Sequence, residues 1–211
     1  MKPKTCLPLA ALAAALLLVG SGCTVPVFDH PLTDDATSTV DGRLLGAWKP
    51  VATDESEKPP FSMLLVGLEP KAQNTLELVT IEMDAENHIQ IKQLKAYTAV
   101  LDMVHYVSIR AEEDGEVKYL VMMYRHGDGE TVRAYMVKNQ AIGAAIEAGE
   151  IKGIAQREKR AVGTPEPPDG PRYSDLNITA ETEELVAFIR KKGESLFDLD
   201  HPLTMRRVPS P

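Results

Sequence analysis

A succession of short strand-like runs limits what this chain can fold into more than any other feature of its sequence. Apolar residues alternate with polar ones, or form dense apolar stretches, over six runs bounded by turn residues: 61–68, 75–83, 88–94, 104–111, 117–125 and 131–138. The segment Gly127-Asp128-Gly129 between the last two runs predicts a tight hairpin. Strands this short and this regularly spaced are typical of antiparallel β-sandwiches and β-barrels.

Two helices are expected after these strands. The first covers 139–148, with Asn139 as its N-cap, and stops at Gly149. The second covers 179–192, with Thr179 as its cap, acidic residues in its first turns and basic residues in its last turn, as the helix dipole favours. The sequence therefore predicts a mainly β fold with a minor α content.

The remaining C-terminal segments complete the same unit. Strands are expected over 151–158 and 203–208. The segment 161–177 holds four prolines, and because proline cannot donate to a strand ladder we expect a loop there. Residues 42–211 are therefore predicted to form a single β-rich domain.

The N-terminus has the composition of an export signal. Lys2 and Lys4 precede an apolar stretch over 7–19, which fits a signal peptide and is short for a membrane span. Small residues then lead into Gly22-Cys23, an order that resembles the lipobox of bacterial lipoproteins. The resemblance implies a signal peptide over 1–22 and a mature protein that begins at a diacylglyceryl- and palmitate-modified Cys23. The alternatives are an uncleaved anchor and an ordinary secretory signal.

The segment after Cys23 is poor in large apolar residues. Residues 23–41 are expected to form a flexible tether between the lipid and the domain. A cysteine that carries several acyl chains anchors stably, whereas a single chain binds a membrane only marginally. Thr24, in the place of an aspartate, resembles outer-membrane lipoproteins, which implies a protein of the cell envelope, anchored in the outer membrane and facing the periplasm.

The composition of the predicted mature chain excludes several classes of protein. Removing residues 1–22 deletes two lysines from the 23 basic residues and none of the 31 acidic ones, so the formal charge becomes −10. An acidic body repels phosphate backbones, and we expect no nucleic-acid partner. Cys6 leaves with the signal and Cys23 is consumed by lipid, so no thiol remains for a disulfide or a metal. No metal site and no cofactor are expected.

The first strand of the domain carries Gly46-Ala47-Trp48, which is similar to the Gly-x-Trp motif of lipocalins and related calycin barrels. In those proteins a basic residue of the last strand lies across the tryptophan, a role that the resemblance gives to Arg206 or Arg207. The mature chain also resembles small bacterial lipoproteins of the same layout, to which no activity is assigned. Together these resemblances imply an antiparallel calycin-like barrel, or a strongly curved sheet, with two short helices.

Methionine and tyrosine gather on the two strands of the predicted central hairpin. We expect Tyr119, Val121, Met123, Tyr135 and Met136 to line a cavity for a small apolar ligand, because thioethers and aromatic rings give adaptable apolar surface. Strand alternation places the first three on one face, which would have to be the concave face of the barrel. The alternative is that these side chains fill a core.

The sequence shows no pair of groups suited to acid–base or nucleophilic catalysis, and a non-catalytic protein is expected. Asp102 and His105 would point to opposite faces of a strand, and His126 is expected in a solvated hairpin turn. Two hypotheses remain. The protein is either a membrane-anchored module that binds a small apolar ligand, or an interaction lipoprotein with a filled barrel that docks another envelope protein. The interior volume of the barrel separates them.

Overall fold

The computed structural model describes residues 24–51, 60–83, 88–113, 115–128, 130–159, 167 and 170–209. The predicted signal peptide 1–22 and Cys23 lie outside these residues. The elements within them are β1 (Val27–Phe28), η1 (Gly42–Leu44), β2 (Gly46–Pro50), β3 (Met63–Glu69), β4 (Ala72–Met83), β5 (Ile89–Leu101), β6 (Val104–Glu113), β7 (Glu116–His126), β8 (Thr131–Met136), α2 (Asn139–Glu147), β9 (Gly153–Arg157), β10 (Tyr173–Ile178), α3 (Thr182–Lys192), η2 (Gly193–Leu196) and β11 (Leu203–Arg207).

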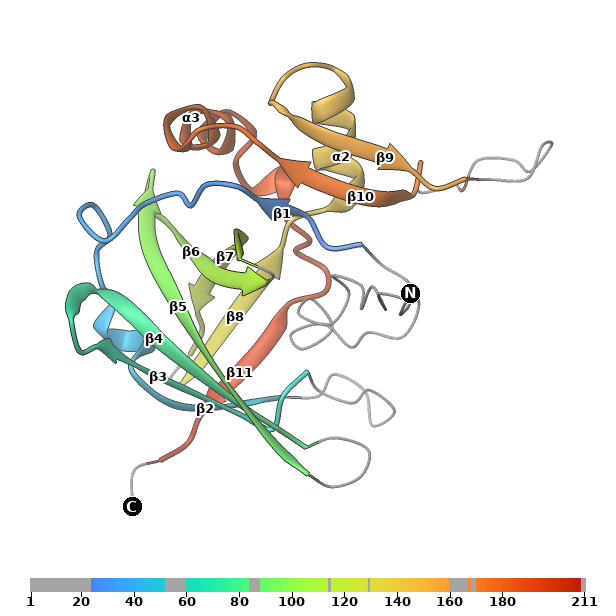
Figure 1. Ribbon diagram of the computed structural model, residues 1–211. Helices are drawn as coiled ribbons and strands as arrows, with labels where there is room; N and C mark the ends of the chain where they lie inside the picture. The colour runs from blue at the N-terminus through green and yellow to red at the C-terminus, as the bar shows by residue number, and fades with distance from the viewer. Residues whose placement is uncertain are drawn as a thin grey trace, which may run out of the picture.

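Eight strands close into an antiparallel β-barrel (Figure 1). Their order is β6-β5-β4-β3-β2-β11-β8-β7, and β7 pairs back with β6. The last strand, β11, lies between β2 and β8, so the two ends of the domain meet in the barrel wall. The predicted mainly β fold with a barrel and two helices is confirmed. Neither of the α-helices among the described residues has the length and apolar character needed to cross a membrane.

A second layer covers one side of the barrel (Figure 1). Strand β1 pairs with β7 through Phe28 and Tyr119, and it pairs in parallel with β10, which pairs in turn with β9. The helices α2 and α3 lie with these short strands, and α2 packs on β9 and β10. An apolar outer surface of the barrel is thereby removed from water.

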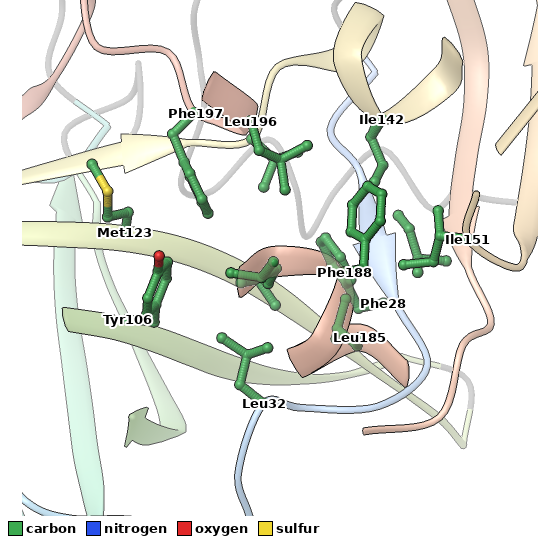
Figure 2. Close-up of a cluster of buried hydrophobic side chains, with 14 of the residues drawn as sticks. Phe28, Leu32, Tyr106, Met123, Ile142, Ile151, Leu185, Phe188, Leu196 and Phe197 are labelled. Carbon is green, nitrogen blue, oxygen red and sulfur yellow. The ribbon is translucent and has the colours of Figure 1, made fainter. Parts of the chain in front are cut away.

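Strand β7 is buried on both of its faces, and it separates two hydrophobic cores. Met122 and Tyr124 point into the barrel and join the interior core, which contains Trp48. Val121 and Met123 point outward and join the outer core, where Figure 2 shows Met123 near Phe197, in the same cluster as Ile142 of α2 and Leu185 and Phe188 of α3. Burying both faces explains why this run is densely apolar and does not alternate.

The structure corrects two predictions for the C-terminal segments. The predicted loop 161–177 ends earlier than expected, because Tyr173–Ile178 forms β10 and pairs with β9. The proline argument applies only up to Pro171, the last proline before that strand. Thr179 is not the helix cap: its backbone N–H donates to the carbonyl of Lys152, and α3 begins at Thr182 with Glu181 as the N-cap residue.

Asn139 also has a different role from the predicted one. It is the first residue of α2 rather than its N-cap, and the cap residue, Lys138, makes no side-chain hydrogen bond to the helix. The Asn139 side-chain amide donates instead to the backbone carbonyl of Thr24. A contact between residues so distant in sequence replaces the expected local one.

Residues 24–41, which the sequence assigns to the tether, pack along the domain. Phe28 and Leu32 are buried in the outer core. The Leu32 N–H donates to the Ser108 hydroxyl, and the Ser38 hydroxyl donates to the carbonyl of Thr98. The buried side chains of Phe28 and Leu32, together with these hydrogen bonds, hold a segment whose composition is mostly polar.

The turn between β5 and β6 carries backbone strain. Leu101 and Val104 pair across it, and the two residues between them, Asp102 and Met103, have φ values of 51° and 67°. Two successive positive φ values define a type I′ hairpin turn, which favours Asn-Gly. A methionine side chain cannot form the local hydrogen bonds that help asparagine or aspartate adopt this conformation. Met103 is also 90% exposed, so packing does not offset the strain.

We expect Met103→Gly to raise the free energy of unfolding by about 0.5–1 kcal/mol, because the left-handed conformation costs a non-glycine residue about 1–2 kcal/mol and glycine loses part of this gain to its greater backbone freedom when unfolded. Urea denaturation measures the change. Asp102→Gly is the matched control and should gain less, because aspartate tolerates the same conformation better. A variant no more stable than the parent protein would contradict this account of the turn.

Candidate functional site

Trp48 and Arg207 lie toward the end of the barrel next to η1, which we call the η1 end. Trp48 is 2% exposed and points into the interior core. The guanidinium carbon of Arg207 lies 4.3 Å from the centre of the Trp48 ring, across the β2–β11 pair. This is the predicted cation–π contact, worth about 0.5–2 kcal/mol.

The backbone around Trp48 is shaped to receive this arginine. Arg207 donates from Nη1 to the carbonyl of Leu45 and from Nη2 to the carbonyl of Arg43. Gly46 has φ +128°, and a Cβ placed there would lie 2.5 Å from Nη1 of Arg207. The glycine of the Gly-x-Trp motif therefore leaves room for the guanidinium. Arg206, the other predicted candidate, is exposed on the outer face and paired in register with Lys49, so it plays no part in this contact.

A carboxylate latch holds η1 against the barrel wall. The Asp41 side chain accepts hydrogen bonds from Nε and Nη2 of Arg43 at 2.9 and 3.0 Å and from the Tyr124 hydroxyl at 3.3 Å. Nε2 of His126 lies 2.8 Å from the same carboxylate. Burial would raise the pKa of Asp41, but the hydrogen bonds from Arg43 and His126 outweigh it and hold the pKa well below its usual range.

His105 completes this cluster. Its ring centroid lies 5.3 Å from that of Tyr124 and 6.0 Å from that of His126. Burial lowers the pKa of His105, and the positive charge of Arg43 acts in the same direction, against the opposing effect of Asp41. Burial also raises the pKa of Tyr124 above its ordinary value. The neutral forms of both rings are therefore favoured.

Sequence reasoning missed this cluster. His126 was expected in a solvated turn, but its side chain is 18% exposed and contacts Asp41. His105 pairs in register with Tyr124, two residues from His126, so strand alternation does place the three rings on one face. Nothing in the sequence connects them to Asp41, which arrives from a distant segment. Because donors surround the Asp41 carboxylate, the cluster acts as a structural latch.

The interior core contains a cavity of about 70 Å³, and Trp48 forms part of its wall. Every barrel strand contributes to its wall, and the wall is apolar apart from three side chains, Trp48, Tyr124 and Thr80. The Trp48 indole N–H donates to the carbonyl of Leu44, and the Tyr124 hydroxyl donates to Asp41. The Thr80 hydroxyl is buried and has no hydrogen-bond partner among the described residues.

Polar groups continue from Thr80 toward the other end of the barrel, which we call the hairpin end because the β4–β5 hairpin extends from it. Lys92 faces Thr80 across the β4–β5 pair. Its ammonium lies 3.5 Å from Oε2 of Glu82, and Oε1 of Glu82 is buried without a hydrogen-bond partner in the described part of the chain. The inner wall thus changes from apolar near Trp48 to charged at the hairpin end.

The predicted ligand-binding residues do not meet in this cavity. Val121, Met123 and Tyr135 are buried in the outer core, and Tyr119 packs against it, so the face expected to be concave is convex. Met136 alone faces the interior core, and it is not in the cavity wall. The physical reason is that both faces of β7 are apolar, so alternation alone could not tell which face a second layer covers.

The described residues hold no group of three or more His, Cys, Asp or Glu side chains with the geometry to bind a metal ion. Comparison with protein-family models, with curated proteins and with solved structures finds no match to this chain. The assignment of a function therefore depends on the geometry of the barrel.

We expect Arg207→Ala to lower the free energy of unfolding by about 2 kcal/mol, since it removes the cation–π contact and two charge-assisted hydrogen bonds to carbonyls. Arg206→Ala, the neighbouring arginine on the exposed face, should change it by no more than about 0.5 kcal/mol. Urea denaturation followed by Trp48 fluorescence compares the two variants. Equal losses of unfolding free energy in the two variants would show that the contact between Arg207 and the Trp48 ring does not hold the barrel closed.

The His105 environment predicts a pH dependence of stability. Because the pKa of His105 in the folded protein lies below its ordinary value of 6.5, the unfolded chain binds a proton at a pH at which the folded chain does not. The contribution of His105 to stability is therefore present at pH values above 6.5 and is lost as the pH falls below that value. Asp41 adds a further loss as the pH falls below 3.8, the ordinary pKa of an aspartate. In His105→Gln the decline between pH 6.5 and roughly 5 should become shallower, as measured by denaturation across that range. An unchanged slope would contradict the assignment.

Proposed function

We propose that this protein is a lipid-anchored, non-catalytic envelope protein whose barrel binds a small apolar ligand in the interior cavity. The observation that supports this most is an apolar cavity with one unpaired buried hydroxyl, that of Thr80. Leaving such a group unpaired costs about 1–3 kcal/mol, which a polar atom of a ligand would recover. The proposed site replaces the Met- and Tyr-rich face that the sequence suggested.

The dimensions of the cavity define the class of ligand. Small-molecule sites usually enclose roughly 300 Å³ or more. The cavity of about 70 Å³ is well below that volume, which favours the filled-barrel alternative and restricts any ligand in this cavity to a short aliphatic tail. Met122 and Met205 in its wall are flexible thioethers that can shift to admit a few more carbons. Lys92 and Thr80 would receive the polar head. A short-chain fatty acid, with its carboxylate at these groups and its tail toward Trp48, has the required chemistry.

The anchor is the second part of the proposal. It rests on the lipobox-like Gly22-Cys23 and the export signal before it. Acyl chains on Cys23 would keep the protein on the outer membrane, where the acidic body faces the periplasm. Nothing in the charge of the chain favours a nucleic-acid partner.

One observation favours the alternative, a protein that docks another envelope protein. The outer surface of β3, β4 and β5 near the hairpin end carries an apolar patch of exposed and half-buried side chains, here called the hairpin face, made of Met63, Leu65, Ile81, Met83, Ile89 and Ile91. Ile81 pairs in register with Met63 and Ile91, and Met83 with Ile89. Ile89 and Ile91 are each 66% exposed. Exposed apolar residues in adjacent rows mark interaction surfaces more often than isolated ones.

Filling the cavity should abolish binding. Ala134 lies in the cavity wall, and Ala134→Leu adds three carbons there. Titration of the mature protein with straight-chain fatty acids from butyrate upward, followed by the fluorescence of the single tryptophan, Trp48, should show saturable binding that this variant weakens by about tenfold or more, equivalent to about 1.4 kcal/mol. Ala47→Leu, which adds the same group beside Trp48 on the outer face, is the matched control and should bind normally.

A second variant keeps the proposal falsifiable if Ala134→Leu folds poorly. Thr80→Val keeps the shape of the side chain and removes the hydroxyl, so it should raise the stability of the unliganded protein by about 1 kcal/mol and weaken fatty-acid binding. Native mass spectrometry of the protein purified from its host would show whether a small molecule copurifies. Absence of saturable binding, together with a protein that carries nothing, would favour docking at the hairpin face.

A further inference from the structure

The mature N-terminus is clamped to the domain from its second residue onward. The Thr24 carbonyl accepts a hydrogen bond from the Asn139 side chain at the start of α2. Three residues later Val27 pairs with Asn177 of β10, and Phe28, which is 1% exposed, is buried against β7. Further along, the Lys118 ammonium lies 2.5 Å from Oδ1 of Asp29. The segment is a strap across the outer core.

This clamp has a consequence for a chain that carries lipid on Cys23. Between the acylated residue and the first clamped residue there is no spacer, and one residue spans at most about 3.6 Å. A domain held in this way cannot hang away from the membrane on a flexible linker, as one with a tether of many residues could. The surface next to Thr24 must lie at the lipid headgroups.

We propose that the domain is seated directly on the bilayer in one orientation, with the hairpin end of the barrel and its hairpin face toward the lipid. This inference rests on the proposed anchor at Cys23. Figure 1 shows the start of β1, the end of β4 and the start of β5 on the same side of the molecule, whereas η1 and the β3–β4 turn lie on the opposite side. The anchor at Cys23 would therefore place the hairpin face against the bilayer interface.

The chemistry of the hairpin face agrees with a membrane interface. Its apolar rows lie nearest the tip, at Met83 and Ile89 and then at Ile81 and Ile91, and the outer surface becomes charged toward η1, where Glu77 pairs in register with Lys95. An amphipathic surface of this kind buries its apolar part at the boundary between headgroups and acyl chains. The charged part of the inner wall, at Lys92 and Glu82, would then lie nearest the lipid.

The absence of other cysteines in the mature body makes the orientation measurable. Three single-cysteine variants of the full, lipidated protein carry a fluorophore: Gln140→Cys beside the Asn139 clamp, Ile91→Cys on the hairpin face, and Lys71→Cys in the β3–β4 turn as the matched control. Each is inserted in vesicles of phosphatidylethanolamine and phosphatidylglycerol that contain a quencher attached to the lipid headgroups. The labels at positions 140 and 91 should be quenched several-fold more strongly than the label at position 71.

A further variant tests the clamp itself. A long Gly/Ser insertion between Cys23 and Thr24 should reduce the quenching at position 140 toward that at position 71, because it restores a flexible linker. Equal quenching at all three positions in the protein without the insertion would overturn the proposal. An Ile91 label that escapes quenching in vesicles, while position 91 is shielded from labelling in host envelopes, would show that a protein covers the hairpin face instead.

Failure of the anchor is recognised separately. Cys23→Ala should remove the acyl mass and release the protein from vesicles. A wild-type protein that carries no acyl mass and does not bind vesicles would overturn both the anchor and the seated orientation. An acylated, vesicle-bound protein with uniform quenching would overturn the orientation alone.

Discussion

The contact of Arg207 with Trp48 joins the first and last strands of the barrel, and the rest of the interior depends on it. Those two strands are far apart in the chain, so closing the barrel carries a large entropic cost that local structure cannot offset. A guanidinium that covers an indole and binds two carbonyls gives this pairing its energy and its register. Gly46 contributes by having no side chain where the guanidinium must lie.

The two ends of the barrel differ in how their polar groups are satisfied. At the η1 end the Asp41 carboxylate is surrounded by donors from Arg43, Tyr124 and His126, so that a half-buried charge is stable there. Toward the hairpin end the hydroxyl of Thr80 and one oxygen of Glu82 are buried without partners among the described residues. A buried hydroxyl that lacks a partner is costly, and the Thr80 hydroxyl could donate to a ligand, which is why the candidate site is assigned to the cavity that it lines.

The strap formed by residues 24–41 links the fold to the proposed location of the protein. It completes the outer core with Phe28 and Leu32 and gives hydrogen bonds to β5 and β6. Its burial therefore stabilises the domain, and the same burial removes the freedom that a tether would have had. The packing of this one segment would therefore also fix the proposed orientation of the domain on the membrane.

The sequence by itself determined most of the barrel strands and the presence of two helices, whereas the contact that closes the barrel was implied only by the resemblance to calycin barrels, which left Arg206 and Arg207 open. Strand runs and helix ends such as Gly149 and Gly193 depend on short-range steric and hydrogen-bond preferences, which a sequence records directly. Only the tertiary structure decided which face of β7 lies inside, since Met122 and Met123 are both apolar and both buried. It also placed Asp41 against His126 and held the polar strap on the outer core. These arrangements depend on contacts between distant segments, whose free energy overrides local preference and leaves no periodic trace in the sequence.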